Sequence, residues 1–249
     1  GESAAGRRVA DHVPALAGLY PELVFASTNE ALGFDVEVVF LALPHGASQD
    51  LVPTFVQRGV QVVDLGADFR MSSPEIYEQW YGHAHRAPEL LASGAGRTPS
   101  ERLHFPRLSS NAEAYGLLHH RHTAEMQNEL GAEVLFTPHL VPVSRGMLVT
   151  AYARVTNGLT TNDALSMLHE TYRHDPCVVV TNEPPSLKDA VGSNLCFVSA
   201  RVDERTGTLI AMSSIDNLVK GAAGQAVQAW NVATGRSEVL GLPLAGVTP

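Results

Sequence analysis

The sequence is poor in cysteine, in basic residues and in long apolar runs. Only two cysteines, Cys177 and Cys196, occur among the 249 residues, so we expect no disulfide framework and a reduced, cytoplasmic protein. No apolar run reaches about 18 residues, so no membrane partner is expected. The 26 Asp and Glu residues outnumber the 17 Lys and Arg residues, and the net charge of −9 argues against nucleic acid as a partner. A small anionic substrate remains compatible with a local cluster of cations.

Two apolar runs in the first half predict a βαβ unit. Residues 36–43 (VEVVFLAL) are almost wholly apolar and rich in valine, which is typical of a strand buried on both faces of a parallel sheet. Residues 48–58 predict a helix and residues 61–65 (QVVDL) predict the next strand. The loops at 44–46 (PHG) and 66–70 (GADFR) then follow neighbouring strands, at the sheet edge where ligands bind.

Serine is expected to begin both helices of this half. Ser48 is a suitable N-cap residue for the first helix. Ser73 precedes Pro74 and an acidic first turn, which predicts a second helix through Tyr81.

Strand patterns dominate from Val134 onwards. Four strands are predicted, at residues 134–138, 147–155, 195–202 and 208–215. Helices are predicted from about Thr161 and from Leu218 to about Thr234. Because a tight turn joins the last two strands, this half is expected to form a mostly antiparallel sheet with helices on one face. The sequence therefore predicts two α/β domains.

The densest polar cluster is His119-His120-Arg121-His122. In an extended segment His120 and His122 point to the same face. Two imidazoles beside a guanidinium suit an anionic substrate, with one histidine available for proton transfer near neutral pH. A solvated polar turn is an equally good interpretation. A metal site is a weaker one, because no carboxylate or cysteine stands at a familiar ligand spacing.

Two glycine-containing segments are candidates for binding an anion. Ser93-Gly94-Ala95-Gly96-Arg97 is a loop of small residues whose backbone N–H groups a phosphate can approach. Residues 216–225 (DNLVKGAAGQ) place two glycines in the opening turns of a helix, each costing about 1 kcal/mol against alanine. Either an anion approaches this helix end or another element packs tightly on it. Arg145 lies between two predicted strands and is either a carboxylate anchor or an ordinary surface arginine.

Taken together, these strings resemble the N-acetyl-γ-glutamyl-phosphate reductases of arginine biosynthesis, which are relatives of aspartate-semialdehyde dehydrogenase. Each string alone is weak, but the ordered set covers nearly the whole chain and is specific. The matching strings are residues 40–46 (FLALPHG), 64–70 (DLGADFR), 76–82 (IYEQWYG), 93–97 (SGAGR), 114–126 (AYGLLHHRHTAEM), 136–146 (FTPHLVPVSRG), 192–194 (GSN) and 215–228 (IDNLVKGAAGQAVQ).

The resemblance implies an NADPH-dependent reduction of an acyl phosphate to an aldehyde. In that family a cysteine thiolate expels phosphate to form a thioester, which hydride converts to a thiohemiacetal and then to the semialdehyde. A histidine of the HRH motif, here His120 or His122, manages the protons, and Arg121 and Arg145 are implied contacts of the substrate anion. The residues implied to line the NADP(H) cofactor are His45, Gly46, Ser93, Gly94, Asn217 and Lys220.

The departures from the family pattern are as informative as the matches. The family begins with a strand and a Gly-rich turn that cradles the dinucleotide phosphates, and nothing similar precedes Gly1. The family's catalytic cysteine lies in a PGCYPT string, but here residues 88–91 run directly into Ala92. Neither Cys177 nor Cys196 aligns with that string. One explanation is that the printed sequence joins stretches of a longer chain near Leu91, which we favour; the other is a shortened, inactive relative.

The expected architecture is a Rossmann-like parallel-sheet NADP domain at 1–91 and an α+β catalytic and dimerisation domain at 92–215. Residues 216–249 are expected to return to the first domain as the C-terminal helix. We expect a homodimer or homotetramer with a small acyl-phosphate substrate and no metal. Alternatives are a sister reductase acting on an aminoadipyl phosphate of lysine biosynthesis, a non-catalytic remnant that only binds or dimerises, and, more distantly, a metal-dependent hydrolase built on the histidine run.

Overall fold

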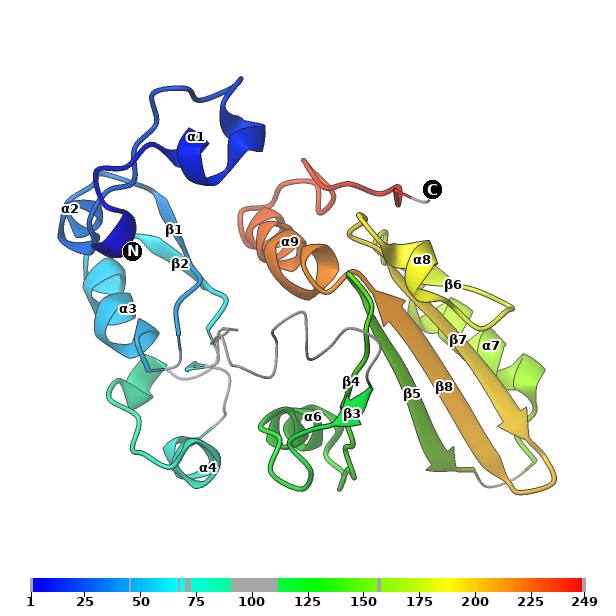
Figure 1. Ribbon diagram of the computed structural model, residues 1–249. Helices are drawn as coiled ribbons and strands as arrows, with labels where there is room; N and C mark the ends of the chain where they lie inside the picture. The colour runs from blue at the N-terminus through cyan, green and yellow to red at the C-terminus, as the bar shows by residue number, and fades with distance from the viewer. Residues whose placement is uncertain are drawn as a thin grey trace.

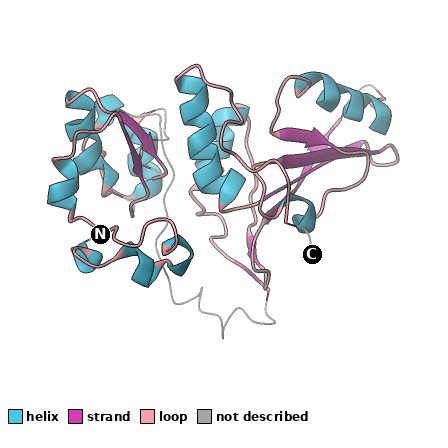
Figure 2. Ribbon diagram, turned by 90° about the horizontal axis from the view of Figure 1, so that it is seen from above, coloured by secondary structure: helices cyan, strands magenta, loops and turns pink. Residues whose placement is uncertain are grey.

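The computed structural model describes residues 2–44, 46–66, 68–69, 73–90, 112–155 and 158–247. Within these ranges the chain forms short helices and one parallel strand pair first, and a larger sheet afterwards (Figures 1 and 2). The helices are α1 (Val9–His12), α2 (Thr28–Leu32), α3 (Ser48–Gln57), α4 (Pro74–Tyr81), α6 (His122–Leu130), α7 (Thr161–Thr171), α8 (Leu187–Ala190) and α9 (Gly224–Ala233). The strands are β1 (Val38–Leu41), β2 (Gln61–Asp64), β3 (Glu113–Ala114), β4 (His139–Leu140), β5 (Met147–Arg154), β6 (Val178–Val180), β7 (Cys196–Asp203) and β8 (Thr208–Ile215).

The predicted βαβ unit is present. β1 and β2 pair in parallel, with Val38 opposite Gln61, and α3 connects them. The helix begins at Ser48 after Ala47, so the predicted N-cap role of Ser48 is wrong. Its hydroxyl instead donates to Asp64 Oδ1 at 3.0 Å, which ties the first turn of α3 to the end of β2.

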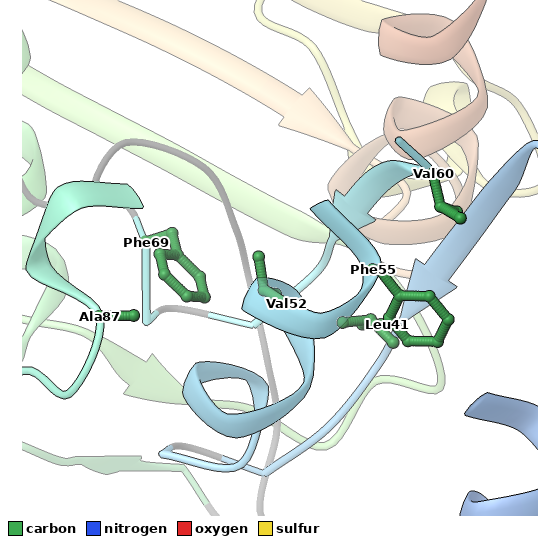
Figure 3. Close-up of a cluster of buried hydrophobic side chains, with 6 residues drawn as sticks. All are labelled: Leu41, Val52, Phe55, Val60, Phe69 and Ala87. Atoms are coloured by element: carbon green, nitrogen blue, oxygen red, sulfur yellow. The ribbon is translucent and has the colours of Figure 1, made fainter. Parts of the chain in front are cut away.

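An apolar cluster holds this unit together. Phe55 of α3 lies against Leu41 of β1, and Phe69 faces Ala87 (Figure 3). The buried members of the cluster are Leu41, Val52, Phe55, Val60, Phe69 and Ala87. This packing fixes the carboxyl ends of both parallel strands, where Gly46 and Asp68 follow.

Helix α4 forms as its end residues predict. Ser73 accepts a hydrogen bond from the Ile76 N–H at 3.2 Å, and Pro74 occupies the first turn. Gly82 ends the helix with φ +77°, a conformation that favours glycine. The helix buries Tyr77 completely.

The second sheet is mostly antiparallel, as predicted. Its order is β5-β8-β7-β6, with β5 and β7 antiparallel to β8 and β6 parallel to β7. Helices α7 and α8 pack on it, and Thr160 caps α7 by accepting the Asp163 N–H. Figure 1 shows α9 between this sheet and the first half, and α9 contacts β2.

One element predicted from the sequence is absent, and another is present but begins with a different winding. Residues 134–138 form no strand, because Leu135 is 83% exposed and proline at 138 has no N–H to donate to a neighbouring strand. The short strand β4 follows directly and pairs with β3. The helix predicted from Leu218 begins as a π-helical turn at Val219–Ala223 before α9. Its wider turn is visible in the bond from the Gly221 N–H to the Asp216 carbonyl, at 2.9 Å.

Candidate active site

His120 and His122 lie together at the beginning of α6. Their ring centroids are 4.7 Å apart, and the His120 ring also makes edge contacts with Tyr115 and Phe136. The His122 backbone N–H donates to His120 Nδ1 at 3.2 Å. Because Nδ1 accepts this bond, the proton of a neutral His120 ring resides on Nε2.

The surroundings of His120 favour its neutral form. Burial lowers the pKa of His120, and the neighbouring His122 and Arg121 lower it further, against a small opposing effect of Glu125. A neutral imidazole with its proton fixed on Nε2 is a hydrogen-bond donor, which can stabilise negative charge that develops on a carbonyl oxygen.

The turn before His120 brings the backbone of Gly116 close to the His120 ring. Gly116 has φ +58°, and a Cβ there would lie 2.9 Å from His120 Cδ2. Leu118 also has a positive φ of 63° and is the one non-glycine residue with this conformation among the described residues. Such strain persists only where the surrounding structure enforces it, and it concentrates at functional sites.

Arg145 is paired with a buried carboxylate. Its Nη2 lies 2.9 Å from Asp216 Oδ2, and Asp216 is fully buried, whereas the Arg145 side chain is 35% exposed. The other partners of Asp216 are the backbone N–H groups of Gly192, Leu218 and Val219. Burial alone raises the pKa of Asp216, but the Gly192 N–H, Arg145 and the two remaining N–H groups outweigh it and lower the pKa to about 2.

Asn217 and Lys220 lie beside this pair. Asn217 Oδ1 accepts the Gly146 N–H at 2.7 Å, next to Arg145. Lys220 Nζ donates to Gln228 Oε1 at 2.8 Å and to Gln225 Oε1. Of the two alternatives for the glycines of this segment, tight packing holds for Gly224, because a Cβ there would collide with Asn194 Oδ1.

Gly46 is held through both of its backbone polar groups. Its N–H donates to Asp68 Oδ1 at 2.9 Å, and its carbonyl accepts from Arg86 Nη2 at 2.5 Å. With φ +83° the position favours glycine. Gly46 is buried, and a Cβ at this position would lie 4.0 Å from both terminal nitrogens of Arg86.

The predicted cofactor residues His45, Ser93 and Gly94, and the junction of Leu91 with Ala92, lie outside the described residues. The described contacts join the other predicted residues in three groups. These are His120, Arg121 and His122 at α6; Arg145, Asn217 and Lys220 at the end of β8; and Gly46 after β1. Their convergence on one cleft stays a prediction.

The two cysteines differ in their surroundings. Cys177 is 1% exposed, and its sulfur lies 3.5 Å from Asn194 Nδ2. Cys196 is half-buried, and burial raises the pKa of its thiol, against a lowering effect of Lys220. A raised pKa leaves less thiolate, so Cys196 is a poor nucleophile despite the nearby ammonium.

Sequence reasoning missed Asp68 and Asp216 as parts of the site. Both are buried carboxylates: Asp68 accepts the Gly46 N–H, and Asp216 pairs with the Arg145 guanidinium. The indication available was an acidic residue soon after a predicted strand, in 64–70 and in 215–217. Among the described residues no group of three or more His, Cys, Asp or Glu side chains is arranged to hold a metal ion.

Two family models match the chain. Residues 1–115 match the NAD binding domain of semialdehyde dehydrogenase, and residues 91–217 match the semialdehyde dehydrogenase dimerisation domain. A protein of Dehalococcoides mccartyi named N-acetyl-gamma-glutamyl-phosphate reductase is 34% identical, with 100% of this chain and 90% of the relative covered. A protein of the same name from Cyanothece sp. is 36% identical, with 100% and 89% covered.

Aspartate semialdehyde dehydrogenase II of Vibrio cholerae is a solved structure with some similarity, at 15% identity and a TM-score of 0.45 over 78% of this chain and 68% of that one. The alignment with the Dehalococcoides mccartyi protein spans 311 positions against the 249 residues of this chain, so about 62 aligned positions have no residue here. In the described residues, no helix is long and apolar enough to cross a membrane.

Proposed function

Because the chain belongs to the N-acetyl-γ-glutamyl-phosphate reductase family, we propose that it serves the NADPH-dependent reduction of N-acetyl-γ-glutamyl phosphate to N-acetylglutamate semialdehyde. The observation that carries the proposal is His120. Burial, His122 and Arg121 lower the pKa of this ring and favour its neutral form, in which the proton resides on Nε2. The ring centroid lies 4.7 Å from that of a second imidazole, His122. An aldehyde-forming reduction needs such a donor beside the reacting carbonyl.

The two histidines have different roles in the reaction. His120 Nε2–H donates to the carbonyl oxygen of the acyl group as negative charge develops on it. His122, in ring contact with His120, is the group that exchanges a proton with the product oxygen. Arg121 follows His120 directly and is a contact for the substrate anion.

Arg145 is the second contact for the substrate anion. Asp216 engages Nη2 and thereby orients the guanidinium, while the partly exposed remainder of the group keeps donors for a carboxylate or phosphate. The buried carboxylate is thus a positioning group rather than a competitor for the substrate.

The residues present fit a nicotinamide cofactor. Gly46 follows a parallel strand, at the sheet edge where ligands bind, and α9, which Lys220 and Asn217 precede, contacts β2 of the same unit. Gly46, Asn217 and Lys220, with His45, Ser93 and Gly94, would hold it. When bound, the cofactor supplies the hydride that reduces the acyl group. We also propose that the cofactor is NADPH rather than NADH, and that the chain divides into residues 1–91, 92–215 and 216–249.

The nucleophile is the part of the reaction that this chain does not provide. Cys177 is buried, and the pKa of the Cys196 thiol is raised, so neither is prepared to attack an acyl phosphate. The aligned positions that have no residue here leave room for the family's cysteine-bearing segment. The printed chain alone is therefore expected to bind the cofactor without turnover.

A homodimer or homotetramer is the proposed assembly. All eight residues of β5 are exposed, and alternate residues of a strand point to opposite faces, so both faces of this edge strand are open. Its exposed apolar side chains include Leu148 and Tyr152, the latter 71% exposed. An open apolar sheet surface of this kind suits a second copy.

The test compares two proteins: the printed chain, and the same chain with the cysteine-bearing segment of the Dehalococcoides mccartyi relative inserted between Leu91 and Ala92. NADPH consumption is followed with N-acetyl-γ-glutamyl phosphate, with a Cys→Ser version of the insert as control. Turnover in the restored chain alone supports the proposal. Preference for a carrier-bound aminoadipyl phosphate would assign the sister reaction. Dimerisation without turnover in any version would identify a non-catalytic remnant.

A further inference from the structure

A buried polar network surrounds the Gly46 turn and is not used by the reaction described above. Its centre is Asp68, which is fully buried and whose Oδ1 accepts from the Gly46 N–H at 2.9 Å and from Tyr77 Oη at 3.0 Å. Its Oδ2 has no hydrogen-bond partner among the described residues. Burying a carboxylate with incomplete pairing is costly, so its presence calls for a function.

The second member of the network is Tyr77 of α4. Its hydroxyl donates to Asp68 and accepts from Gln49 Nε2 at 2.7 Å. Burial raises the pKa of Tyr77 well above its ordinary value, and Asp68 raises it further, so the hydroxyl keeps its proton at neutral pH. Gln49 lies in the first turn of α3, directly after the Gly46 turn, and its Oε1 accepts the Arg86 N–H. Backbone on both sides of the turn is thereby held by buried side chains.

The same tyrosine reaches the histidine helix. The Tyr77 ring stacks on Tyr81 with centroids 4.4 Å apart and an interplanar angle of 12°, and Tyr77 packs against Ala124 of α6. The Tyr81 hydroxyl lies 3.5 Å from Glu125 Oε1, also in α6. Ala124 and Glu125 belong to the first turn of the helix that His122 begins.

We propose that Asp68 and Tyr77 are positioning residues that fix the Gly46 turn and the first turn of α6 relative to each other. One aromatic side chain thereby connects the backbone proposed to hold the cofactor with the imidazole pair proposed to act on the substrate. The assignment of these two ends rests on the proposed function. The mechanical connection between them rests only on the contacts of Asp68, Tyr77, Tyr81 and α6.

The primary variant is Tyr77→Phe, which removes the hydroxyl and keeps the ring that packs on Tyr81 and Ala124. Tyr20→Phe, at an exposed site in the first half, is the matched control. Three quantities are measured on the full chain well below its unfolding temperature: hydrogen exchange of the Gly46 amide, the NMR titration of His120, and the Kd of NADPH.

Tyr77→Phe is expected to speed Gly46 exchange by roughly tenfold or more, because Asp68 loses one of its two donors and releases the turn. The His120 titration midpoint is expected to move toward that of free histidine by about 0.3 pH unit or more, as α6 shifts and hydrates the ring. NADPH binding should weaken by roughly 3- to 10-fold. The control should change none of the three.

A change at Gly46 without any change at His120 would overturn the proposal, because the two ends would then be independent. If Tyr77→Phe fails to fold, Asp68→Leu replaces it, since leucine has a similar size and removes the acceptor of both the Gly46 N–H and the Tyr77 hydroxyl. Absence of NADPH binding by the wild-type chain would count against the proposed function, whereas the exchange and titration data would still decide the connection.

Discussion

The two halves of the molecule are stabilised in different ways. Around the β1–β2 pair, a compact apolar cluster lies beside buried polar side chains that hydrogen-bond in series, namely Asp68, Tyr77 and Gln49. In the sheet of β5 to β8, long strands pair along eight residues, yet the edge strand β5 is exposed throughout. The first half is therefore organised around the Gly46 turn, which we propose to hold the cofactor, and the second has an exposed strand, which we propose to bind another copy of the chain.

The groups assigned to the chemistry are the histidines of α6 and the pair of Arg145 with Asp216. His120 and His122 begin α6, which packs on α4 of the first half through Ala124. Arg145 precedes β5 of the second half and pairs with Asp216 after β8. If these roles are separate, substitutions at the histidine pair, at Asp216 and in β5 should affect turnover, stability and assembly respectively.

The largest effect is expected at the histidine pair. In the cysteine-restored chain, His120→Asn should lower kcat by roughly 10²- to 10³-fold, the usual loss when a positioned donor to a developing oxyanion is removed. His169→Asn, at an exposed site of α7, is the control and should leave kcat unchanged. A fall of less than about threefold for His120→Asn would mean that another group donates to the carbonyl oxygen.

The next effect concerns the stability of the second half. Asp216→Asn should lower the free energy of unfolding by about 2 to 3 kcal/mol, because a buried acceptor of three N–H groups and of Arg145 loses its charge. Asp11→Asn, in an exposed pair with Arg8, should change it little. Urea unfolding curves of the two variants measure the difference.

The same carboxylate predicts a pH dependence. Its pKa falls from 3.8 to about 2 on folding, so its contribution is complete above the unfolded value and is lost as the pH falls toward 2. Wild type should therefore lose stability between about pH 4 and pH 2 more steeply than Asp216→Asn. Equal losses of stability in the two proteins would show that Asp216 does not cause this pH dependence.

Assembly should respond to changes in β5 alone. Leu148 and Tyr152 are four residues apart and share a face of the strand, so Leu148→Glu with Tyr152→Glu places two charges on it. The variant should weaken dimerisation at least about tenfold, seen by light scattering after gel filtration. Leu19→Glu, on the exposed surface of the first half, is the control. Equal dimer fractions in all three proteins would place the interface elsewhere.

The smallest effects are expected at the cysteines. Cys177→Ala and Cys196→Ser should leave turnover of the restored chain within about twofold and cost about 1 kcal/mol of stability. Thermal unfolding and initial rates measure both. Loss of activity in either variant, with the fold intact, would mean that the chemistry had moved to that residue.

Local patterns predicted local structure well. The βαβ unit, the Ser73 cap and the β7–β8 hairpin follow from side chains that act within a few residues of themselves. The strand predicted at 134–138 failed because an apolar run without a partner strand or a buried face does not form one. The π-helical turn after Asp216 was not predicted, because it depends on the Asp216 carboxylate accepting the N–H groups of Leu218 and Val219.

Sequence patterns did not predict the long-range contacts. The network from Gly46 to Glu125 joins the side chains of Asp68, Tyr77, Tyr81 and Glu125 to one turn, and no sequence periodicity relates them. The family resemblance indicated which residues matter, but it indicated neither that Asp216 orients Arg145 nor that His120 is fixed as the Nε2–H form. Those facts depend on atomic contacts that only the folded chain defines.

The acyl chemistry is assigned to a cysteine other than the two that this chain contains. Peptide mapping by mass spectrometry tests this assignment, on the cysteine-restored chain incubated with N-acetyl-γ-glutamyl phosphate in the absence of NADPH. Release of phosphate and an acyl thioester on the inserted cysteine alone are expected. An acyl group on Cys177 or Cys196 would overturn the assignment.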